Sequence, residues 1–368
     1  MAEPTEQETA KPEEPRSRLA LGARIPVRKI VLVGLSLSLT IAVVAGSWAT
    51  LSDGTFTGAQ WESFIVAGLS TGSLYALIAL GYTLVYGILF IINFAHGEVF
   101  MAGAFASFFV ARDLSESGFL NDNPILAITV LLLLAGATSA GIALILERVA
   151  YRPLRGAPRL VPLITAIGAS LFIQYTFRGL FGPQTRGYAE ISILNGRLDI
   201  LGVSILKTQL LSIVGAALLM AGLYYFVNRT RRGRAMRAVG EDREIASLMG
   251  IDVDRTIVTT FVIGGVLAGA AGVLWALNFG QVSFQMGFIP GIKAFTAAVL
   301  GGIGSITGAA LGGVLVGLLE AVAPPLLLGG AEVKSLFQLQ DLVAFSILVL
   351  VLIFRPGGLL GSAEQEKV

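Results

Sequence analysis

Long apolar stretches dominate this chain, and most polar residues are gathered between them. The stretches are about 20 residues long, which is the length that an α-helix needs to cross a hydrocarbon core of about 30 Å. We therefore predict an all-α polytopic membrane protein with about eight long transmembrane helices. The predicted spans are 30–50, 62–85, 93–111, 125–146, 161–181, 209–227, 257–279 and 339–354.

The segment 292–323 differs from these spans because two short apolar pieces are separated by Gly301-Gly302-Ile303-Gly304. We interpret it as a short, glycine-rich helical hairpin. Seven spans before it leave the chain outside and the last span must end inside, so the hairpin must contribute an even number of crossings. Gly304, Gly308 and Gly312 repeat at small-xxx-small spacing, which predicts close helix packing.

Composition supports the membrane assignment and removes several kinds of chemistry. The chain is 55% hydrophobic and 14% charged, against about 25% charged residues in a soluble domain. It has no cysteine, which excludes disulfides, zinc–thiolate sites, iron–sulfur clusters and a cysteine nucleophile. Its one histidine, His96, excludes a histidine metal cluster, so we expect no metal and no cofactor. Nothing in the sequence indicates nucleic-acid binding.

The distribution of basic residues predicts the orientation in the membrane. Lysine and arginine number 19 in the tail before residue 30, the loops 147–160 and 228–256, and the C-terminal end, and five in the alternate loops. Cytoplasmic loops carry the excess of basic residues in multi-pass proteins. We therefore expect both termini to be cytoplasmic.

Asn93, His96 and Glu98 stand out in the stretch 63–111, which otherwise lacks Asp, Glu, Lys, Arg and His. Such side chains are costly in a membrane and usually face a cavity or one another. Asn93 is expected to cap a helix that starts at Phe94, whose positive end would suit a substrate carboxylate. The alternative is that His96 and Glu98 only hydrogen-bond neighbouring helices and hold the fold.

Several motifs resemble one family of transporters. Gly68 to Leu77, Gly81-Tyr82-Thr83 and Ile91 to Glu98 are similar to the first half of branched-chain amino-acid permeases of the LivH type. Three later stretches agree in the correct order: 147–153, 233–251 and 293–305. The resemblance runs from about residue 62 to the C-terminus and leaves residues 1–60 unexplained.

The resemblance implies the permease subunit of an ABC importer for leucine, isoleucine and valine. It also implies four kinds of partner: a homologous second permease similar to LivM, two cytoplasmic ATPases, an extracytoplasmic binding protein and membrane lipid. ATP would be used by the ATPases, and no Gly-Lys-Ser/Thr step of a P-loop occurs in this chain. The implied division is 1–29 disordered cytoplasmic tail, 30–50 extra helix, 60–356 permease transmembrane domain and 357–368 cytoplasmic tail.

The loop 228–256 contains Glu244-Ile245-Ala246-Ser247-Leu248-Met249-Gly250, which resembles the Glu-Ala-Ala-x3-Gly kernel of ABC-importer coupling loops. Ile245 replaces the first alanine of that kernel. The resemblance implies that Arg243, Glu244, Ala246 and Gly250 help a short helix to dock in a groove of the ATPase. The alternative is an ordinary basic loop that only sets topology.

Three classes of function remain to be compared. A related ABC permease would take urea, short amides or other amino acids, because such permeases share these motifs. An ion-coupled secondary transporter would need coupling carboxylates near the midplane, where Glu98 is the strongest candidate. An intramembrane enzyme would need a catalytic constellation that this sequence lacks, with one histidine, no cysteine and no pair of intramembrane aspartates.

Overall fold

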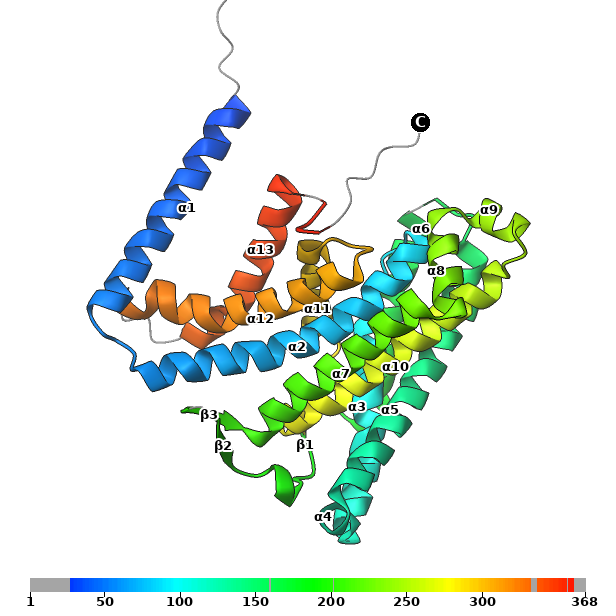
Figure 1. The fold of residues 1–368 in the computed structure, drawn as a ribbon, viewed down its shortest axis with the longest axis horizontal. Helices are drawn as coiled ribbons and strands as arrows, with labels where there is room; N and C mark the ends of the chain where they lie inside the picture. Colours follow the sequence, from blue (N-terminus) through cyan, green and yellow to red (C-terminus); the bar gives the residue numbers. More distant parts are fainter. Residues whose placement is uncertain (1–26, 159, 201, 332–335, 356, 361–368) are drawn as a thin grey trace, which may run out of the picture. The chain divides into compact units, whose positions relative to one another are not determined.

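The structure is a computed structural model that describes residues 27–158, 160–200, 202–331, 336–355 and 357–360 (Figure 1). Long helices make up most of the described chain, as predicted for an all-α membrane protein. They are α1 (Val27–Ser52), α2 (Gly58–Leu89), α3 (His96–Glu116), α5 (Pro124–Leu146), α6 (Leu160–Phe181), α7 (Lys207–Arg229), α10 (Val253–Phe279) and α12 (Ile306–Leu328). The predicted tail 1–29 lies outside the described residues up to position 26.

Shorter elements connect these helices. The shorter α-helices are α4 (Phe119–Asp122), α8 (Arg231–Glu241), α9 (Arg243–Leu248), α11 (Phe288–Gly301) and α13 (Gln340–Phe354). Single turns are η1 (Glu147–Tyr151), η2 (Arg152–Leu154), η3 (Ser192–Leu194), η4 (Gly329–Ala331) and η5 (Leu336–Leu339). Two antiparallel pairs complete the fold: β1 (Arg186–Gly187) with β4 (Gln281–Val282), and β2 (Arg197–Ile200) with β3 (Val203–Leu206).

Six helices of the described chain are long and apolar enough to cross a membrane: α2, α5 with its continuation to Leu154, α6, α7, α10 and α12. Five of them match predicted spans, and α12 is the second half of the predicted hairpin. That half is 23 residues long rather than short. Predicted spans 30–50, 93–111 and 339–354 are helical, as α1, α3 and α13, but are not among the six, so the number eight is not confirmed.

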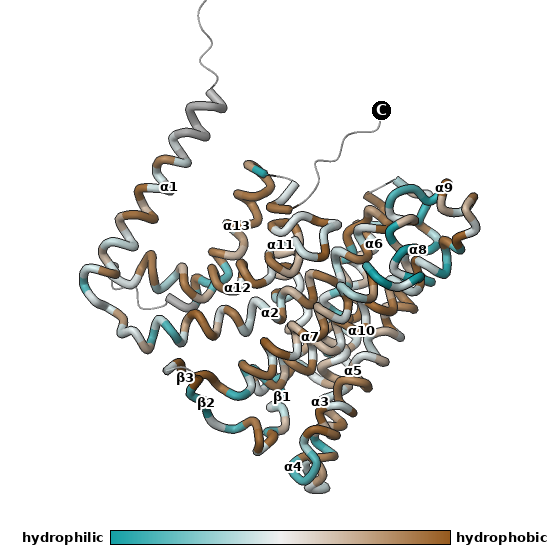
Figure 2. The backbone as a smooth tube through the Cα atoms, in the orientation of Figure 1, coloured by the Kyte–Doolittle hydropathy of each residue, from teal (hydrophilic) through white to brown (hydrophobic). Residues whose placement is uncertain are grey.

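The described residues from Gly46 onward form one compact unit, and those before it belong to another. Within the larger unit, α2 and α10 are largely buried, whereas α5, α6 and α7 expose apolar side chains such as Phe172 and Leu218. Figure 2 shows hydrophobic residues along the long helices and polar residues gathered around α8 and α9. This distribution suits a bundle whose outer helices face lipid or other membrane subunits.

Glycines allow α2 and α12 to touch through their backbones. Gly313 lies against Ala76, and Gly317 lies against Gly72, so that a methyl group at either glycine would collide with the α2 backbone. Gly308 and Gly312 pack in the same way against Gly301 and Ala297 of α11, as the small-residue spacing predicted. Close packing of this kind replaces the hydrophobic driving force that is missing between helices in lipid.

The predicted packing role of Gly304 is wrong. Its φ angle is 98°, and a methyl group at this position would meet no atom within 4 Å. Gly302 has a φ angle of 104°, so both residues belong to the turn between α11 and α12. Positive φ angles favour glycine because it has no Cβ atom. The three glycines at small-xxx-small spacing thus have two different roles: Gly304 belongs to the turn, whereas Gly308 and Gly312 pack against α11.

The chain after α13 returns to this turn. The Leu359 and Leu360 amides donate hydrogen bonds to the carbonyls of Leu300 and Gly301, at 2.8 and 2.9 Å. Residues 357–360 of the predicted C-terminal tail are thus packed against the end of α11, and the remaining residues, 361–368, lie outside the described chain.

Two helices begin inside the bundle rather than at its surface. The first turn of α3 lies beside Gly81, eight residues before the end of α2, which corresponds to a depth of about 12 Å. The first turn of α11 lies against it: a methyl group at Gly291 would be 3.1 Å from the Cα atom of Gly97. The chain enters α3 from the end where α2 stops, and it enters α11 from the end where α10 stops. Because α2 and α10 are antiparallel, the two helices start at one level from opposite ends.

Candidate functional site

The polar residues at the start of α3 are buried: Asn93, His96 and Glu98 are all 3% exposed or less. The predicted cap by Asn93 is wrong, because α3 starts at His96 and its N-cap is Ala95, without a side-chain hydrogen bond. Asn93 instead accepts a hydrogen bond of 2.6 Å from the Tyr151 hydroxyl. The helix starts two residues later than expected, so the Asn93 side chain turns to η1 instead of to the helix amides.

His96 occupies a space that two glycines create. A methyl group at Gly81 would collide with the imidazole, and one at Gly264 would lie 3.7 Å from its Cε1 atom. The Tyr82 ring packs edge-on at 5.0 Å between ring centroids. The Nε2 atom has no hydrogen-bond partner among the described residues. The histidine therefore joins α2, α3 and α10 mainly by packing.

Glu98 lies between the first turns of α3 and α11. Its Oε1 atom accepts a hydrogen bond of 3.3 Å from the Ser170 hydroxyl of α6, and its Oε2 atom faces Gly287 just before α11. Helix N-termini carry partial positive charge, and two of them favour an anion at this place. The positive end that was expected to meet a substrate carboxylate is thus occupied by a carboxylate of the chain itself.

The loop 228–256 folds into α8 and α9, and each helix in this region has a side-chain cap. Thr230 accepts from the Gly233 amide at 3.0 Å at the start of α8. Asp242 accepts from the Glu244 and Ile245 amides, both at 2.9 Å, at the start of α9. These caps account for the helix-turn-helix in a loop that is otherwise polar.

Two of the predicted coupling residues face inward. The Arg243 guanidinium donates to the carbonyl of Ile88 at the end of α2, at 2.6 Å from Nη2 and 3.2 Å from Nε. Burial, and then the nearby Arg155, lower the pKa of Arg243 from its ordinary value. Ala246 is 3% exposed, so its small size serves packing within this chain. Glu244 and Gly250 are exposed, and Gly250 ends the turn after α9 with a φ angle of 82°.

Three apolar side chains project from α9 and the turn after it. Ile245, Leu248 and Met249 are 60%, 86% and 78% exposed, although the surrounding loop is strongly polar. They repeat at i, i+3 and i+4, which places them on one face of a helix. That spacing was a signal in the sequence, and it points to a protein contact because exposed apolar groups of this kind mark interaction sites.

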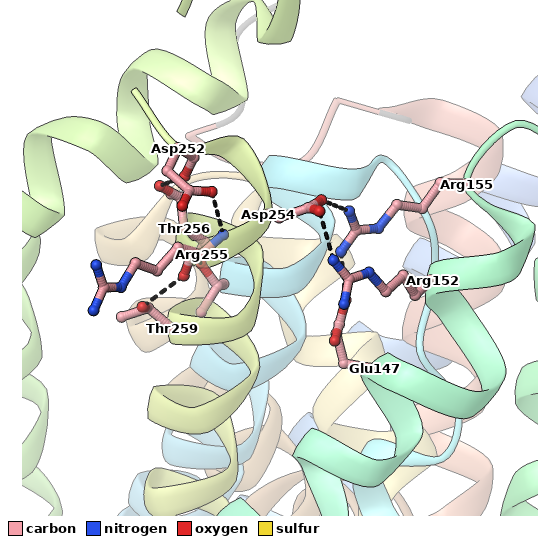
Figure 3. Close-up of polar contacts among 9 residues, drawn as sticks. Glu147, Arg152, Arg155, Asp252, Asp254, Arg255, Thr256 and Thr259 are labelled. Carbon is pink, nitrogen blue, oxygen red and sulfur yellow. Dashed lines mark hydrogen bonds and ion pairs between the residues drawn. The ribbon is translucent and has the colours of Figure 1, made fainter. Parts of the chain in front are cut away.

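A charged network ties the loop after α5 to the start of α10 (Figure 3). Arg152 and Arg155 approach Asp254 from one side, with Arg152 Nη2 2.6 Å from the Asp254 Oδ2 atom. Arg155 also pairs with Glu147, whose side chain is completely buried. Asp252 caps α10 by accepting from the Arg255 amide at 2.9 Å. The network fixes the end of the bundle that carries α8 and α9.

A second buried ion pair lies toward the other end of the bundle. Lys293 of α11 is 2.5 Å from the Glu320 Oε1 atom of α12. Lys293 is also 2.6 Å from Asp341 Oδ1 at the start of α13. Asp341 was not predicted from the sequence, although its place in the first turn of the last apolar segment was an available signal.

This fold and these sites define a multi-pass helical membrane protein with a polar helical loop at one end of its bundle. A family model described as "Branched-chain amino acid transport system / permease component" matches residues 64–352. The chain therefore belongs to this permease family.

Relatives agree over most of their length. The high-affinity branched-chain amino acid transport system permease protein BraD of Pseudomonas aeruginosa is 46% identical over 309 residues, 83% of this chain and 97% of that protein. The corresponding protein LivH of Escherichia coli K12 is 43% identical over 306 residues, 82% of this chain and 96% of that protein. No solved structure matches the chain.

The packing of His96 gives the first prediction. Gly81→Ala should displace the imidazole and lower the yield of folded protein, whereas Gly87→Ala on the same helix should not, because its methyl group meets only Gly304 at 3.9 Å. Overpacking of this kind typically costs about 1–3 kcal/mol. The yield of monodisperse protein in detergent measures the effect. Recovery of yield in the double variant Gly81→Ala/His96→Ala is expected, and its absence would contradict a packing role for His96.

The second prediction compares Arg152 and Arg155, which are both drawn in Figure 3. Arg155→Met leaves the buried Glu147 carboxylate without its cation, and breaking a buried pair costs about 3–5 kcal/mol. Arg152→Met removes only the exposed pair with Asp254 and should be much milder. Thermal unfolding of the purified protein measures both. Equal losses in the two variants would show that Glu147 does not depend on Arg155.

Proposed function

We propose that this chain is the membrane-spanning permease subunit of an ATP-driven ABC importer for leucine, isoleucine and valine. The observation that carries the proposal is the match to permeases named for branched-chain amino acids over more than four fifths of the chain. The family model matches residues 64–352, which include most of the bundle and the loop 228–256. Uptake of these amino acids by the reconstituted complex, with urea and short amides as competitors, tests the substrate.

Four partners complete the proposed importer: a homologous second permease, two cytoplasmic ATPases and an extracytoplasmic binding protein. ATP is bound and hydrolysed by the ATPases in this proposal, and this chain uses no cofactor of its own. The apolar face of Ile245, Leu248 and Met249 supplies the contact with one ATPase, because these side chains are exposed on a short, capped helix. Glu244 and the surrounding arginines set its register by charge.

Arg243 would transmit a movement of α9 to helix α2 in the membrane. This side chain bonds to the Ile88 carbonyl in the last turn of α2, so α9 is attached to the helix at the centre of the bundle. Gly240 at the end of α8 lies against the Gly87 carbonyl in the same turn. The loop is thus attached at two points to α2, which in turn packs on α10, α11 and α12. A displacement imposed by the ATPase passes along this helix.

The proposed orientation places α8 and α9 in the cytoplasm of a bacterium, with both termini on the same side and the membrane being the plasma (inner) membrane. Because the chain has no cysteine, single cysteines report their side without interference. Leu248→Cys should react with a membrane-impermeant maleimide only in inverted vesicles, and Ile193→Cys only in right-side-out vesicles. Both positions are more than half exposed. The reverse labelling pattern would overturn the orientation.

Leu248→Asp should uncouple the importer. The side chain is 86% exposed, so the permease should still fold, but a charge replaces a central apolar contact with the ATPase. Losing such a contact commonly costs about 2 kcal/mol or more, which weakens association at least about tenfold. The measurement is the ATPase stimulation by liganded binding protein in proteoliposomes.

Ser247→Asp is the matched control, since it adds the same charge on the opposite face of α9. It should retain most of the stimulation. Gly250→Trp should also uncouple, although it alters a backbone with positive φ as well as the surface. Full stimulation and uptake by Leu248→Asp would mean that the ATPase docks elsewhere, and the loop would then serve only topology.

A further inference from the structure

A pocket of about 320 Å³ lies between α2, α10, α11 and α12, beside the first residue of α13. Aromatic and aliphatic side chains form one wall, and a lysine and a glutamate lie in the other. Its volume is at the small end of the range of about 300–1,000 Å³ that is typical of ligand sites. The residues that matter here are Tyr75, Trp275, Phe279, Ile289, Lys293 and Glu320.

Lys293 and Glu320, which form the charged wall of the pocket, do not use all of their hydrogen-bonding groups. Lys293 directs two of its three N–H groups to Glu320 and Asp341, at 2.5 and 2.6 Å, which leaves one for a ligand. Glu320 uses Oε1 in this pair, and its buried Oε2 atom has no hydrogen-bond partner among the described residues. An unpartnered carboxylate oxygen in a membrane-buried site is costly unless a ligand supplies a donor.

We infer that this pocket is a binding site for a free α-amino acid with an apolar side chain. The ligand ammonium donates to Glu320 Oε2, and the ligand carboxylate accepts from the third N–H group of Lys293. The wall offers an acceptor at Glu320 Oε2 and a donor at Lys293, so it suits a ligand that carries both a cation and an anion. One molecule with both charges on neighbouring atoms fits this wall better than a simple amine, an acid or a sugar.

The opposite wall selects the side chain. The Trp275 and Phe279 rings lie 4.3 Å apart, and Tyr75 is 6.0 Å from Trp275, each between ring centroids. Ile289 adds an aliphatic surface at the start of α11. An apolar ligand group is removed from water against this wall, while a charged or strongly polar group would lose its hydration without a partner.

The pocket lies toward the end of the bundle away from α8 and α9. Trp275 and Phe279 belong to the last two turns of α10, whose first turn lies next to α9. In the proposed orientation this end faces outside, where a binding protein releases its ligand. The inference therefore rests on the proposed function for the identity of the ligand, while the pocket and its charges stand independently of that function.

A purely structural role for the ion pairs makes a different prediction. If Lys293 only ties α11 to α12 and α13, then Glu320→Gln and Asp341→Asn should both affect folding and neither should affect a ligand selectively. If the pocket binds an amino acid, the two variants should differ, because Glu320 lines the pocket, whereas the half-exposed Asp341 contacts Lys293 from outside it.

The test measures binding of radiolabelled L-leucine to the purified complex of permeases and ATPases, without binding protein and without ATP. Binding should be saturable. The competitors 4-methylpentanoate, which lacks the ammonium group, and 3-methylbutylamine, which lacks the carboxylate, should each be at least about tenfold weaker than unlabelled leucine. Glu320→Gln should weaken leucine binding at least about tenfold, whereas Asp341→Asn should stay within about threefold of the native affinity.

Ala67→Leu provides a second variant that keeps both ion pairs and fills the pocket from α2. This variant should abolish leucine binding. If Glu320→Gln does not fold, Ala67→Leu alone tests whether the pocket binds leucine. The inference is overturned if the native complex binds no leucine, if either truncated competitor equals leucine, or if the variant that folds binds leucine normally. Uptake by the native complex with its binding protein distinguishes this inference from the proposed function. If the complex takes up leucine but the pocket does not bind it, only the inference about the pocket is wrong. If the complex takes up none of the three amino acids, the proposed function is wrong.

Discussion

The backbone contact between α2 and α12 is the interaction on which the rest of the bundle depends. Gly313 and Gly317 bring α12 so close to Ala76 and Gly72 that no side chain separates the two helices. This approach sets the position of α11, which is joined to α12 by a tight turn, and hence the position of Lys293 above the Tyr75 ring. At the other end of α2, the same helix carries the carbonyl that holds Arg243. The glycine-lined contact between α2 and α12, the seam, thus helps to position Lys293 at one end of the bundle and Arg243 at the other.

Polar groups inside the bundle follow a common logic. Helices α3 and α11 each begin in the interior, where free amides are expensive, and Glu98 lies where their positive ends meet. At the same depth, His96 packs against the neighbouring helices, and Asn93 accepts a hydrogen bond from the Tyr151 hydroxyl. Interrupted helices are tolerated in membranes only where protein surrounds them, and the burial of α2 and α10 supplies that surrounding. The start of α3 is therefore enclosed by neighbouring helices of the bundle.

Hydropathy and charge predicted much of this fold. The sequence predicted the spans at α5, α6, α7 and α10 and the break at Gly301 to Gly304, because helix length and a glycine-rich break are local properties. The sequence did not predict four other features: the depth at which α3 starts, the partner of Asn93, the turn role of Gly304 and the inward side of Ala246. Each depends on which helix lies opposite, and a linear pattern does not contain that information.

Helix α2 is also longer than the membrane is thick. Its 32 residues extend over about 48 Å, against a hydrocarbon core of about 30 Å. Such a helix must tilt or project into the headgroup region. Because α12 packs against α2 at Gly72 and Ala76, well inside the helix, a small change of tilt about this contact would move the two ends of α2 in opposite directions. A displacement of a few ångströms at Ile88 would then move the opposite end of α2, near Gly58, in the reverse direction, with the contact of Gly72 and Ala76 with α12 as the pivot.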